Sequence, residues 1–320
     1  MAQHFLLSPA AKTLSLTKVL RMTDRQAETA FRSIRWASTN GDPVCPRCSG
    51  TKHYHLAKRK VWKCKACEKQ FSLTSGTIFH SRKLMLRDIL GAIAIFTNGA
   101  KGYSALQLSR DLGCDYKSCF VLLHKMRESI ALARDEGALK GDVEIDGAYF
   151  GGYVKPANKA VDRKDLRKKA NQSGKRQSVV VMRERKGRTV AYVTAREADG
   201  VVLARNAIAS GATVHADEAS HWDQLAANFP IKRINHQVAY ADGGASTNNA
   251  ESFFSRMRRA EIGVHHHIAG PYLSAYATEL AWRENARRQS NGNQFAMLVT
   301  AAAAAPKSKA WSGYWQRRGS

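Results

Sequence analysis

The sequence predicts a multi-domain α/β protein in which a small metal-binding module and a helical region precede a core with a mixed β-sheet. Three observations support this fold class: two paired cysteine motifs near the start, helical periodicity in the N-terminal half, and alternating strand-type and helix-type runs after residue 140. The length of 320 residues suggests roughly two domains. An apolar fraction of 44% is normal for a chain with buried cores and excludes global disorder.

The charge balance indicates a polyanionic partner. The 51 Lys and Arg residues exceed the 26 Asp and Glu residues by 25, so the chain is strongly basic. Nucleic acid is the first candidate and an acidic membrane surface the second. The sequence has no run of 18 apolar residues, which argues against a membrane span, and its six cysteines are too few for a disulfide framework. We therefore expect a soluble protein of a reducing compartment.

Four of the cysteines form two CxxC pairs with the spacing of a structural zinc site. Cys45 and Cys48 are separated by two residues, as are Cys64 and Cys67, and fifteen residues lie between the pairs. Each CxxC turn places two thiolates on one side of the metal, and two turns complete a tetrahedron. Because the intervening segment has hairpin character, residues 41–80 are predicted to form a zinc ribbon. The alternative is a pair of redox motifs.

Residues 1–40 are predicted to form an N-terminal helical segment, and residues 81–135 a helix-turn-helix region. In the second region, Ser104 has the position of a helix cap, and Gly113 supplies a tight turn between two apolar helical patterns. The helix that starts near Asp115 would present three residues to the major groove of DNA, namely Tyr116, Lys117 and Ser118. The alternative is an ordinary helical hairpin. The two remaining cysteines, Cys114 and Cys119, fit no motif and are expected to be buried apolar residues.

Three acidic residues have special positions in the predicted α/β core, residues 140–300. The run 142–150 alternates as a strand does, and Asp146 lies inside it, where a charge is costly unless it is paired or binds a metal. A later short strand ends at Asp217, and a helix after that carries Glu251 in its first turns. The order of elements is three strands, helix, strand, helix, strand and helix. A ribonuclease H-like fold has this order and brings the three acidic positions together.

These three acids predict a metal-dependent phosphoryl-transfer site. Clustered carboxylates bind two Mg²⁺ ions, which activate water or a 3′-hydroxyl and stabilise the leaving oxygen. Arg258 lies seven positions after Glu251, about two helical turns, so it is on the same helix face and is expected to hold DNA phosphates. The alternative for each single acid is an ordinary surface carboxylate.

Residues 153–178 are predicted to form a basic insertion between two strands of the core. From position 155 to position 188 the sequence has 13 Lys or Arg residues and 3 acidic residues. Such a segment either contacts a phosphate backbone or is a solvated loop. The residues expected to contact phosphate are Lys168, Lys169, Lys175 and Arg176. The chain ends in a second basic segment, the tail 301–320.

The order of these motifs is that of a known family. The chain contains, in sequence, the stretches CPRC, WKCKACEKQFSLTSGTIF, VEIDGAYFGG, HADE, TNNAESFFSRMRRAEIGVHHHI and YLSAYATELAWREN. It thereby resembles insertion-sequence transposases of the ISXO type, a zinc-ribbon branch of the DDE superfamily, over roughly residues 22–300.

The resemblance implies a DNA transposase that binds the ends of its mobile element and catalyses metal-dependent DNA cleavage and strand transfer. It implies a ribonuclease H-like core, a structural Zn²⁺ ion, and catalytic Mg²⁺ or Mn²⁺ held by Asp146, Asp217 and Glu251. The implied partners are double-stranded DNA, both as terminal inverted repeats and as target, and further copies of this chain in a homodimer or higher oligomer. No membrane partner is expected, and the expected location is cytoplasmic, with the nucleoid.

The sequence departs from the family pattern at three positions near the predicted site. Gly147 stands where the family usually has an acid, Ser246 where it has His, and Arg258 where it has Lys. Asn248 is an alternative third ligand, because some branches use an Asn. Glu251 is preferred, because an anionic ligand binds Mg²⁺ more strongly.

Some roles stay open on the sequence alone. His266 and His267 correspond to a His pair of the family, and they are expected either to support the active site or DNA binding or to be structural. Two other functions compete with transposition: a non-catalytic DNA-binding regulator derived from a transposase, and a metal-dependent nuclease or resolvase of the same fold. The presence of all three acids argues against the regulator, whereas nothing in the sequence separates a transposase from a nuclease.

Overall fold

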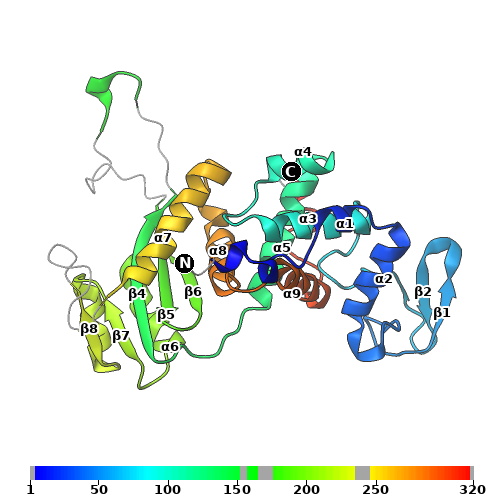
Figure 1. Ribbon diagram of the computed structural model, residues 1–320, viewed down its shortest axis with the longest axis horizontal. Helices are drawn as coiled ribbons and strands as arrows, with labels where there is room; N and C mark the ends of the chain where they lie inside the picture. Colours follow the sequence, from blue (N-terminus) through cyan, green and yellow to red (C-terminus); the bar gives the residue numbers. More distant parts are fainter. Residues whose placement is uncertain (1–3, 152–156, 165–175, 235–245, 318–320) are drawn as a thin grey trace. The chain divides into compact units, whose positions relative to one another are not determined.

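The computed structural model describes residues 4–151, 157–164, 176–234 and 246–317 of the chain (Figure 1). The chain divides into two compact units, one made of Met1–Arg134 with Arg288–Ser320 and the other of Asp135–Arg287. In the part of the chain that the structure describes, no helix is both long and apolar enough to cross a membrane.

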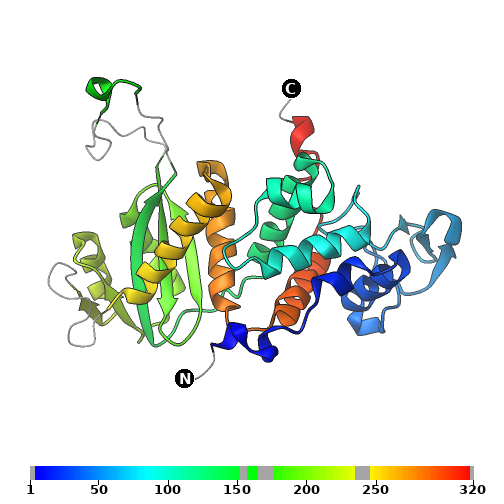
Figure 2. The ribbon, with the colours of Figure 1, turned by 45° about the horizontal axis from the view of Figure 1, so that its top comes forward.

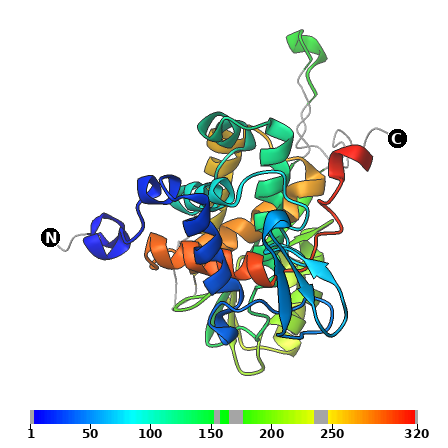
Figure 3. The ribbon, with the colours of Figure 1, turned by 90° about the vertical axis from the view of Figure 1, so that its right-hand side faces the viewer.

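The first unit combines a small antiparallel sheet with a set of helices. The sheet has the order β1-β2-β3, with the bounds His53–Leu56, Val61–Cys64 and Gln70–Phe71. The helices are α1 (Leu16–Leu20), α2 (Asp24–Arg35), α3 (Leu86–Asn98), α4 (Ala105–Leu112), α5 (Tyr116–Leu132), α9 (Asn291–Ala304) and α10 (Tyr314–Arg317). Figures 1 and 3 show the light-blue hairpin of β1 and β2 beside α2.

Helix α2 is fixed at its start by a capping box and along its length by the small sheet. The Thr23 hydroxyl accepts from the backbone N–H of Gln26, whose side chain accepts from the backbone N–H of Thr23 at 2.8 Å. Just after the helix, the Trp36 ring meets the Trp62 ring of β2 edge to face, with centroids 5.5 Å apart. Arg32 lies over the same Trp62 ring. These contacts attach the sheet to the helical part of the unit.

Helix α9 belongs to the first unit, whereas the sequence placed residues up to 300 in the catalytic domain. It packs against α2, α3 and α5 and buries Leu298 and Val299 there. At its start, the Asn291 side chain accepts from the N–H of Leu14 at 2.8 Å and donates to the carbonyl of Leu14 at 3.0 Å. The two ends of the chain therefore meet in one unit, a long-range contact that local sequence patterns do not carry.

The second unit is built on a mixed sheet, as the sequence predicts. Among the described residues, the strand order is β6-β5-β4-β7-β8. Strands β4, β5 and β6 are antiparallel neighbours, whereas β7 runs parallel to β4 and β8 parallel to β7. The bounds are β4 (Asp142–Phe150), β5 (Gln177–Glu184), β6 (Thr189–Thr194), β7 (Thr213–Ala216) and β8 (Ile231–Arg233).

Helices cover both faces of this sheet (Figures 1 and 2). They are α6 (Gly200–Ala207), the 3-10 helix η8 (Ser220–Ala227), α7 (Asn248–Ala260) and α8 (Leu273–Asn285). On β4, Ala148 and Phe150 pack with α7 and α8, whereas Val143 and Ile145 pack with α6 and η8. Side chains alternate along a strand, so Asp146 points to the α7 face and position 147 to the α6 face.

Candidate metal centres and active site

The four cysteines predicted to bind zinc form one cluster. All four sulfur atoms lie within 4.8 Å of one another, and the pairs Cys45–Cys67 and Cys48–Cys64 are each 3.6 Å apart. A tetrahedral Zn²⁺ ion with Zn–S bonds of about 2.3 Å requires sulfurs about 3.8 Å apart. The donor set and its spacing therefore fit a structural zinc ion, with no coordination position left for water.

Two matching turns bring the cysteines into this arrangement. The backbone N–H of Ser49 donates to the carbonyl of Cys45 at 2.9 Å, and that of Glu68 donates to the carbonyl of Cys64 at 3.1 Å. Ser49 and Glu68 both have a φ of 57°, in the left-handed region. Each CxxC pair thus has the same local fold, which explains why spacing alone predicts this site.

Helices α4 and α5 follow one another through a short turn, as the sequence predicts. The Ser104 side chain caps α4 by accepting from the N–H of Gln107 at 3.1 Å. Gly113 ends α4 with a φ of 61°, and the Asp115 side chain caps α5 by accepting from the N–H of Ser118 at 3.1 Å. The order and the turn are those expected for a helix-turn-helix, whereas groove binding stays a prediction.

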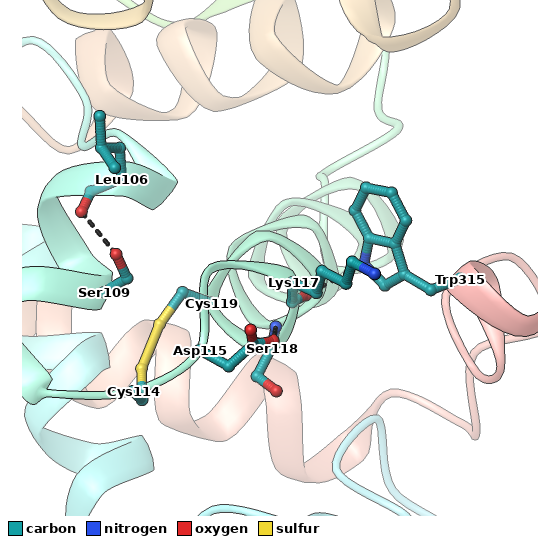
Figure 4. Close-up of a disulfide and its surroundings, with 8 residues drawn as sticks. All are labelled: Leu106, Ser109, Cys114, Asp115, Lys117, Ser118, Cys119 and Trp315. Carbon is teal, nitrogen blue, oxygen red and sulfur yellow. Dashed lines mark hydrogen bonds between the residues drawn. A yellow bond between two sulfur atoms is a disulfide. The ribbon is translucent and has the colours of Figure 1, made fainter.

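The residues predicted to contact the major groove lie at the start of α5, where the C-terminal tail packs. Tyr116 and Lys117 are exposed and Ser118 is half-buried. The Lys117 ammonium lies 5.5 Å from the Trp315 ring centroid, and the Trp315 indole N–H donates to the Lys117 carbonyl at 3.2 Å (Figure 4). Trp315, from the segment predicted as a basic tail, thus covers part of this helix start.

A disulfide joins Cys114 and Cys119 across the turn into α5 (Figure 4). The sequence predicted two buried apolar residues here. Cys119 is fully buried, but Cys114 is half-buried and the two are bonded. The cap at Asp115 starts a helix between them, which brings residues five positions apart close together.

Strand register brings Asp146 and Asp217 side by side. The parallel pairing of β4 and β7 ends with Ile145 opposite Ala216, so the next residue of each strand is an aspartate. The two acids that the sequence selected 71 positions apart are therefore neighbours, with Asp146 in the middle of β4 and Asp217 at the carboxyl end of β7. Open α/β sheets commonly bind ligands at the carboxyl ends of their strands.

A third carboxylate in this cluster, Glu197, was not predicted from the sequence. One carboxylate oxygen from each of Asp146, Glu197 and Asp217 lies within 4.8 Å of the others. Glu197 begins the 3-10 helix η7 (Glu197–Asp199), which leads into α6. No motif or strand pattern marks this position. The one signal in the sequence was indirect, the lack of an acid at Gly147.

Burial and repulsion by neighbouring carboxylates raise the pKa values of Asp146 and Glu197. Burial is the main cause that raises the pKa of Asp146 to about 7; the charge of Asp217 adds to it, and Glu197 and Glu251 contribute smaller shifts. The backbone N–H of Gly147 partly opposes this rise. Burial, followed by the charge of Asp217, also raises the pKa of Glu197 to about 7. Oxygen donors that repel one another in this way fit a divalent cation, which would neutralise them.

A buried carboxylate, Glu144, fixes helix α7 against β4. It lies two residues before Asp146 on the strand and is 1% exposed. Its oxygens accept from the backbone N–H groups of Asn249 at 2.7 Å and Ala250 at 3.2 Å, at the positive end of the helix. The Arg185 guanidinium pairs with the same carboxylate at 3.1 Å. Because residue 144 is on the same face of β4 as Asp146, its hydrogen bonds with Asn249 and Ala250 hold the start of α7 near the acidic residues.

Glu251 approaches the acidic cluster from α7. It is half-buried in the first turn of the helix, and its charge contributes to the raised pKa of Asp146. Asn248, the alternative third ligand, is exposed at the first position of the helix. Arg258 is exposed about two turns further on, and its guanidinium lies 5.7 Å from the Phe150 ring centroid. These placements favour Glu251 over Asn248, and the ligand assignment stays a prediction.

The two histidines predicted to support the site follow the far end of α7. After this helix the chain continues as a π-helix, Glu261–His265. His266 is exposed with a φ of 59°, and the His267 ring lies 4.0 Å from the Glu261 carboxylate. Both residues thus lie at the opposite end of α7 from Glu251, and their support of the active site stays a prediction.

The basic insertion is described in part. Lys168, Lys169 and Lys175 lie outside the described residues. Arg176, just before β5, is exposed, and its guanidinium lies 5.3 Å from the Tyr149 ring centroid on β4. The exposed Arg176 side chain is accessible to a phosphate, and the phosphate contact stays a prediction.

Two family models match the segments that contain the two candidate metal centres. The ISXO2-like transposase domain matches residues 138–285, which contain the acidic cluster, and the transposase zinc-ribbon domain matches residues 22–70, which contain the four cysteines. The chain is therefore similar to ISXO2-like transposases over residues 138–285 and to the transposase zinc ribbon over residues 22–70. The family resemblance that the ordered motifs predicted is therefore confirmed.

A curated relative supports the same assignment. The chain is 23% identical over 271 residues to an uncharacterized protein in transposable element ISH50 of Halobacterium salinarum. The alignment covers 80% of the chain and 90% of that relative. No solved structure gave a significant match to the chain.

Proposed function

We propose that this chain is a transposase that binds the ends of its mobile element and catalyses metal-dependent DNA cleavage and strand transfer. The observation that carries the proposal is the meeting of Asp146 and Asp217 where the parallel pairing of β4 and β7 ends, inside the matched transposase domain. A DNA-binding regulator that catalyses no reaction has no need of clustered carboxylates whose negative charges repel one another. The protein is expected to work on DNA as a homodimer or higher oligomer, with the nucleoid.

The sheet supports a ribonuclease H-like core for this unit. Three antiparallel strands that follow one another in sequence are extended by two strands parallel to the first. The acids lie in the middle of β4, directly after β7, and in the first turn of α7. These are the three places at which the sequence located them.

We assign Asp146, Asp217 and Glu251 as ligands of catalytic Mg²⁺ or Mn²⁺. Bound divalent ions supply activation of water or a 3′-hydroxyl and stabilisation of the leaving oxygen. The chain itself orients these ligands. The register of β4 and β7 fixes the two aspartates, and the hydrogen bonds of Glu144 with the start of α7 fix that helix. Arg258, exposed further along α7, is proposed to hold a DNA phosphate.

A strand-transfer assay with the full chain, its own element ends and Mg²⁺ tests this function. Asp146→Asn, Asp217→Asn and Glu251→Gln should each abolish cleavage and joining, because each removes a negative ligand and keeps the side-chain shape. Glu218→Gln is the matched control, since Glu218 is an exposed acid next to Asp217, and it should retain activity.

The outcomes of this assay separate the competing functions. Cleavage without joining by the wild-type protein would indicate a nuclease of the same fold. Loss of joining in Asn248→Ala with retention in Glu251→Gln would make Asn248 the third ligand. Activity in all the acid variants would contradict a metal-carboxylate site.

End binding is proposed to rest on the first unit, through the zinc ribbon and the start of α5. The net charge of +25 supports a strong phosphate contribution, and Tyr116 and Lys117 are exposed at the helix start. In gel-shift titrations, Lys117→Ala should weaken binding to the element ends and lower the salt-dependence slope by about 1. An unchanged slope would place this lysine outside the DNA contact.

A further inference from the structure

Glu197 reaches the acidic cluster from the opposite side of the sheet to Glu251. It precedes α6, which packs with the odd-numbered residues of β4, whereas Glu251 is on α7, which packs with the even-numbered residues. Its carboxylate nevertheless comes within 4.8 Å of Asp146 and Asp217 oxygens. Strand β7 ends at Ala216 and does not continue beside β4 past this point, so the Glu197 side chain can reach the cluster there.

Gly147 provides the space through which Glu197 passes. A Cβ atom built on Gly147 would lie 2.3 Å from Cγ and 2.5 Å from Cδ of Glu197. Any side chain at position 147 therefore requires Glu197 to move. Because position 147 points to the α6 face, the missing side chain and the incoming carboxylate occupy the same place.

Local contacts do not explain why Glu197 lies here. Its side chain is 18% exposed, and the described residues include no hydrogen-bond donor to its carboxylate. His221 is its one partner at ion-pair distance among them, with Nε2 3.6 Å from Oε1. Two like-charged groups, Asp146 and Asp217, lie close to it. A carboxylate held beside two others with so little compensation is suited to binding a cation.

We propose that Glu197 is a fourth metal ligand of the active site and that Gly147 is the residue that admits it. The inference rests on the proposed function and extends its ligand set. Carboxylates then meet the metal from both faces of the sheet, Glu251 from α7 and Glu197 from the side of α6. The acid that the family usually carries beside the first aspartate is replaced in space by an acid fifty positions later in the chain.

Mn²⁺ titration of the full-length protein, followed by the electron paramagnetic resonance of the free ion, tests this inference without requiring catalysis. Mutation of a group that contacts a metal ligand, rather than the metal itself, typically weakens metal binding by about 10–100-fold, and loss of a direct ligand should cost at least as much. Glu197→Gln should therefore weaken Mn²⁺ binding by at least about tenfold. Gly147→Ala should have a similar effect, although it removes no charge, because the new methyl group displaces the Glu197 side chain.

The double variant tests most directly whether Gly147 and Glu197 act together. If both changes act through one carboxylate, Gly147→Ala combined with Glu197→Gln should bind Mn²⁺ no more weakly than either single variant. Glu197→Asp, which keeps the charge and shortens the side chain, should also weaken binding. Glu218→Gln, an exposed acid beside Asp217, should leave it unchanged. A thermal melt of each variant establishes that it is folded.

The result that overturns the inference is wild-type Mn²⁺ affinity in Glu197→Gln. Wild-type affinity in Gly147→Ala would overturn the role of Gly147. Asp217→Asn distinguishes these failures from a failure of the proposed function. If Asp217→Asn loses binding while Glu197→Gln retains it, the inference fails and the proposed function stands. If Asp217→Asn also retains binding, both fail.

Discussion

The zinc cluster and the acidic cluster are both sets of metal-binding side chains, but they are assembled over very different distances along the chain. The four cysteines lie within 22 positions and are placed by two identical turns. The acids come from β4, from the end of β7, and from two helices on opposite faces of the sheet. The first site depends on local backbone geometry, whereas the second depends on strand order and register.

The largest expected effect is on the zinc site, which depends on local backbone geometry. Cys45→Ser combined with Cys48→Ser should remove the zinc, found at about one ion per wild-type chain by elemental analysis, and unfold the ribbon. Structural zinc contributes about 10–16 kcal/mol of apparent binding free energy, which is comparable with the whole stability of a domain. Mn²⁺ binding by the acidic cluster should persist. A wild-type protein that is fully folded without zinc would contradict this difference between the two sites.

A smaller loss is expected when the support of the acidic site is removed. Glu144→Gln places an amide N–H₂ opposite either the backbone N–H donors of Asn249 and Ala250 or the Arg185 guanidinium, and removes the charge that pairs with Arg185. Breaking a buried charge pair from one side costs about 3–5 kcal/mol, so urea should unfold the second unit at a lower concentration.

Mn²⁺ binding should also weaken in Glu144→Gln, because α7 loses its attachment beside Asp146. Glu136→Gln, at an exposed position of the same unit, should change neither property. Wild-type stability in Glu144→Gln would show that register alone positions the helix.

The sequence predicted the two sites to different extents for physical reasons. Repeated spacing located all four cysteines, and mid-strand or strand-end positions located Asp146 and Asp217, which register then brings together. Glu197 escaped prediction because its approach depends on the path of η7 and on the absence of a side chain at position 147. Glu144 escaped for a similar reason, since its partners are 105 and 106 positions away on another element.

The smallest expected effect concerns protonation of the acidic cluster. The pKa of Asp146 is raised from its ordinary value of 3.8 to about 7, mainly by burial. Between these pH values the folded metal-free protein binds more protons at this group than the unfolded chain does, so its stability falls as pH rises and levels off above about 7.

Thermal melts of the zinc-loaded, Mg²⁺-free protein measure this dependence. Each loss of about 1 kcal/mol lowers Tm by about 2–4 °C in a domain of this size. Asp146→Asn should make the profile shallower and leave the contribution of Glu197, whose pKa is also raised to about 7, and saturating Mg²⁺ should reverse it by favouring the ionised forms. A wild-type profile that rises from pH 5 to 7 without metal would contradict the raised pKa.

The central claim is that the carboxylates gathered around β4 and β7 form the catalytic metal site. Crystals of the full-length protein soaked in Mn²⁺ and measured at the manganese absorption edge test it most directly. We predict anomalous peaks in contact with the carboxylates of Asp146 and Asp217, with Glu251 and Glu197 as further ligands, and a separate zinc peak among the four cysteines. Manganese bound elsewhere, with no peak at the two aspartates, would contradict the account.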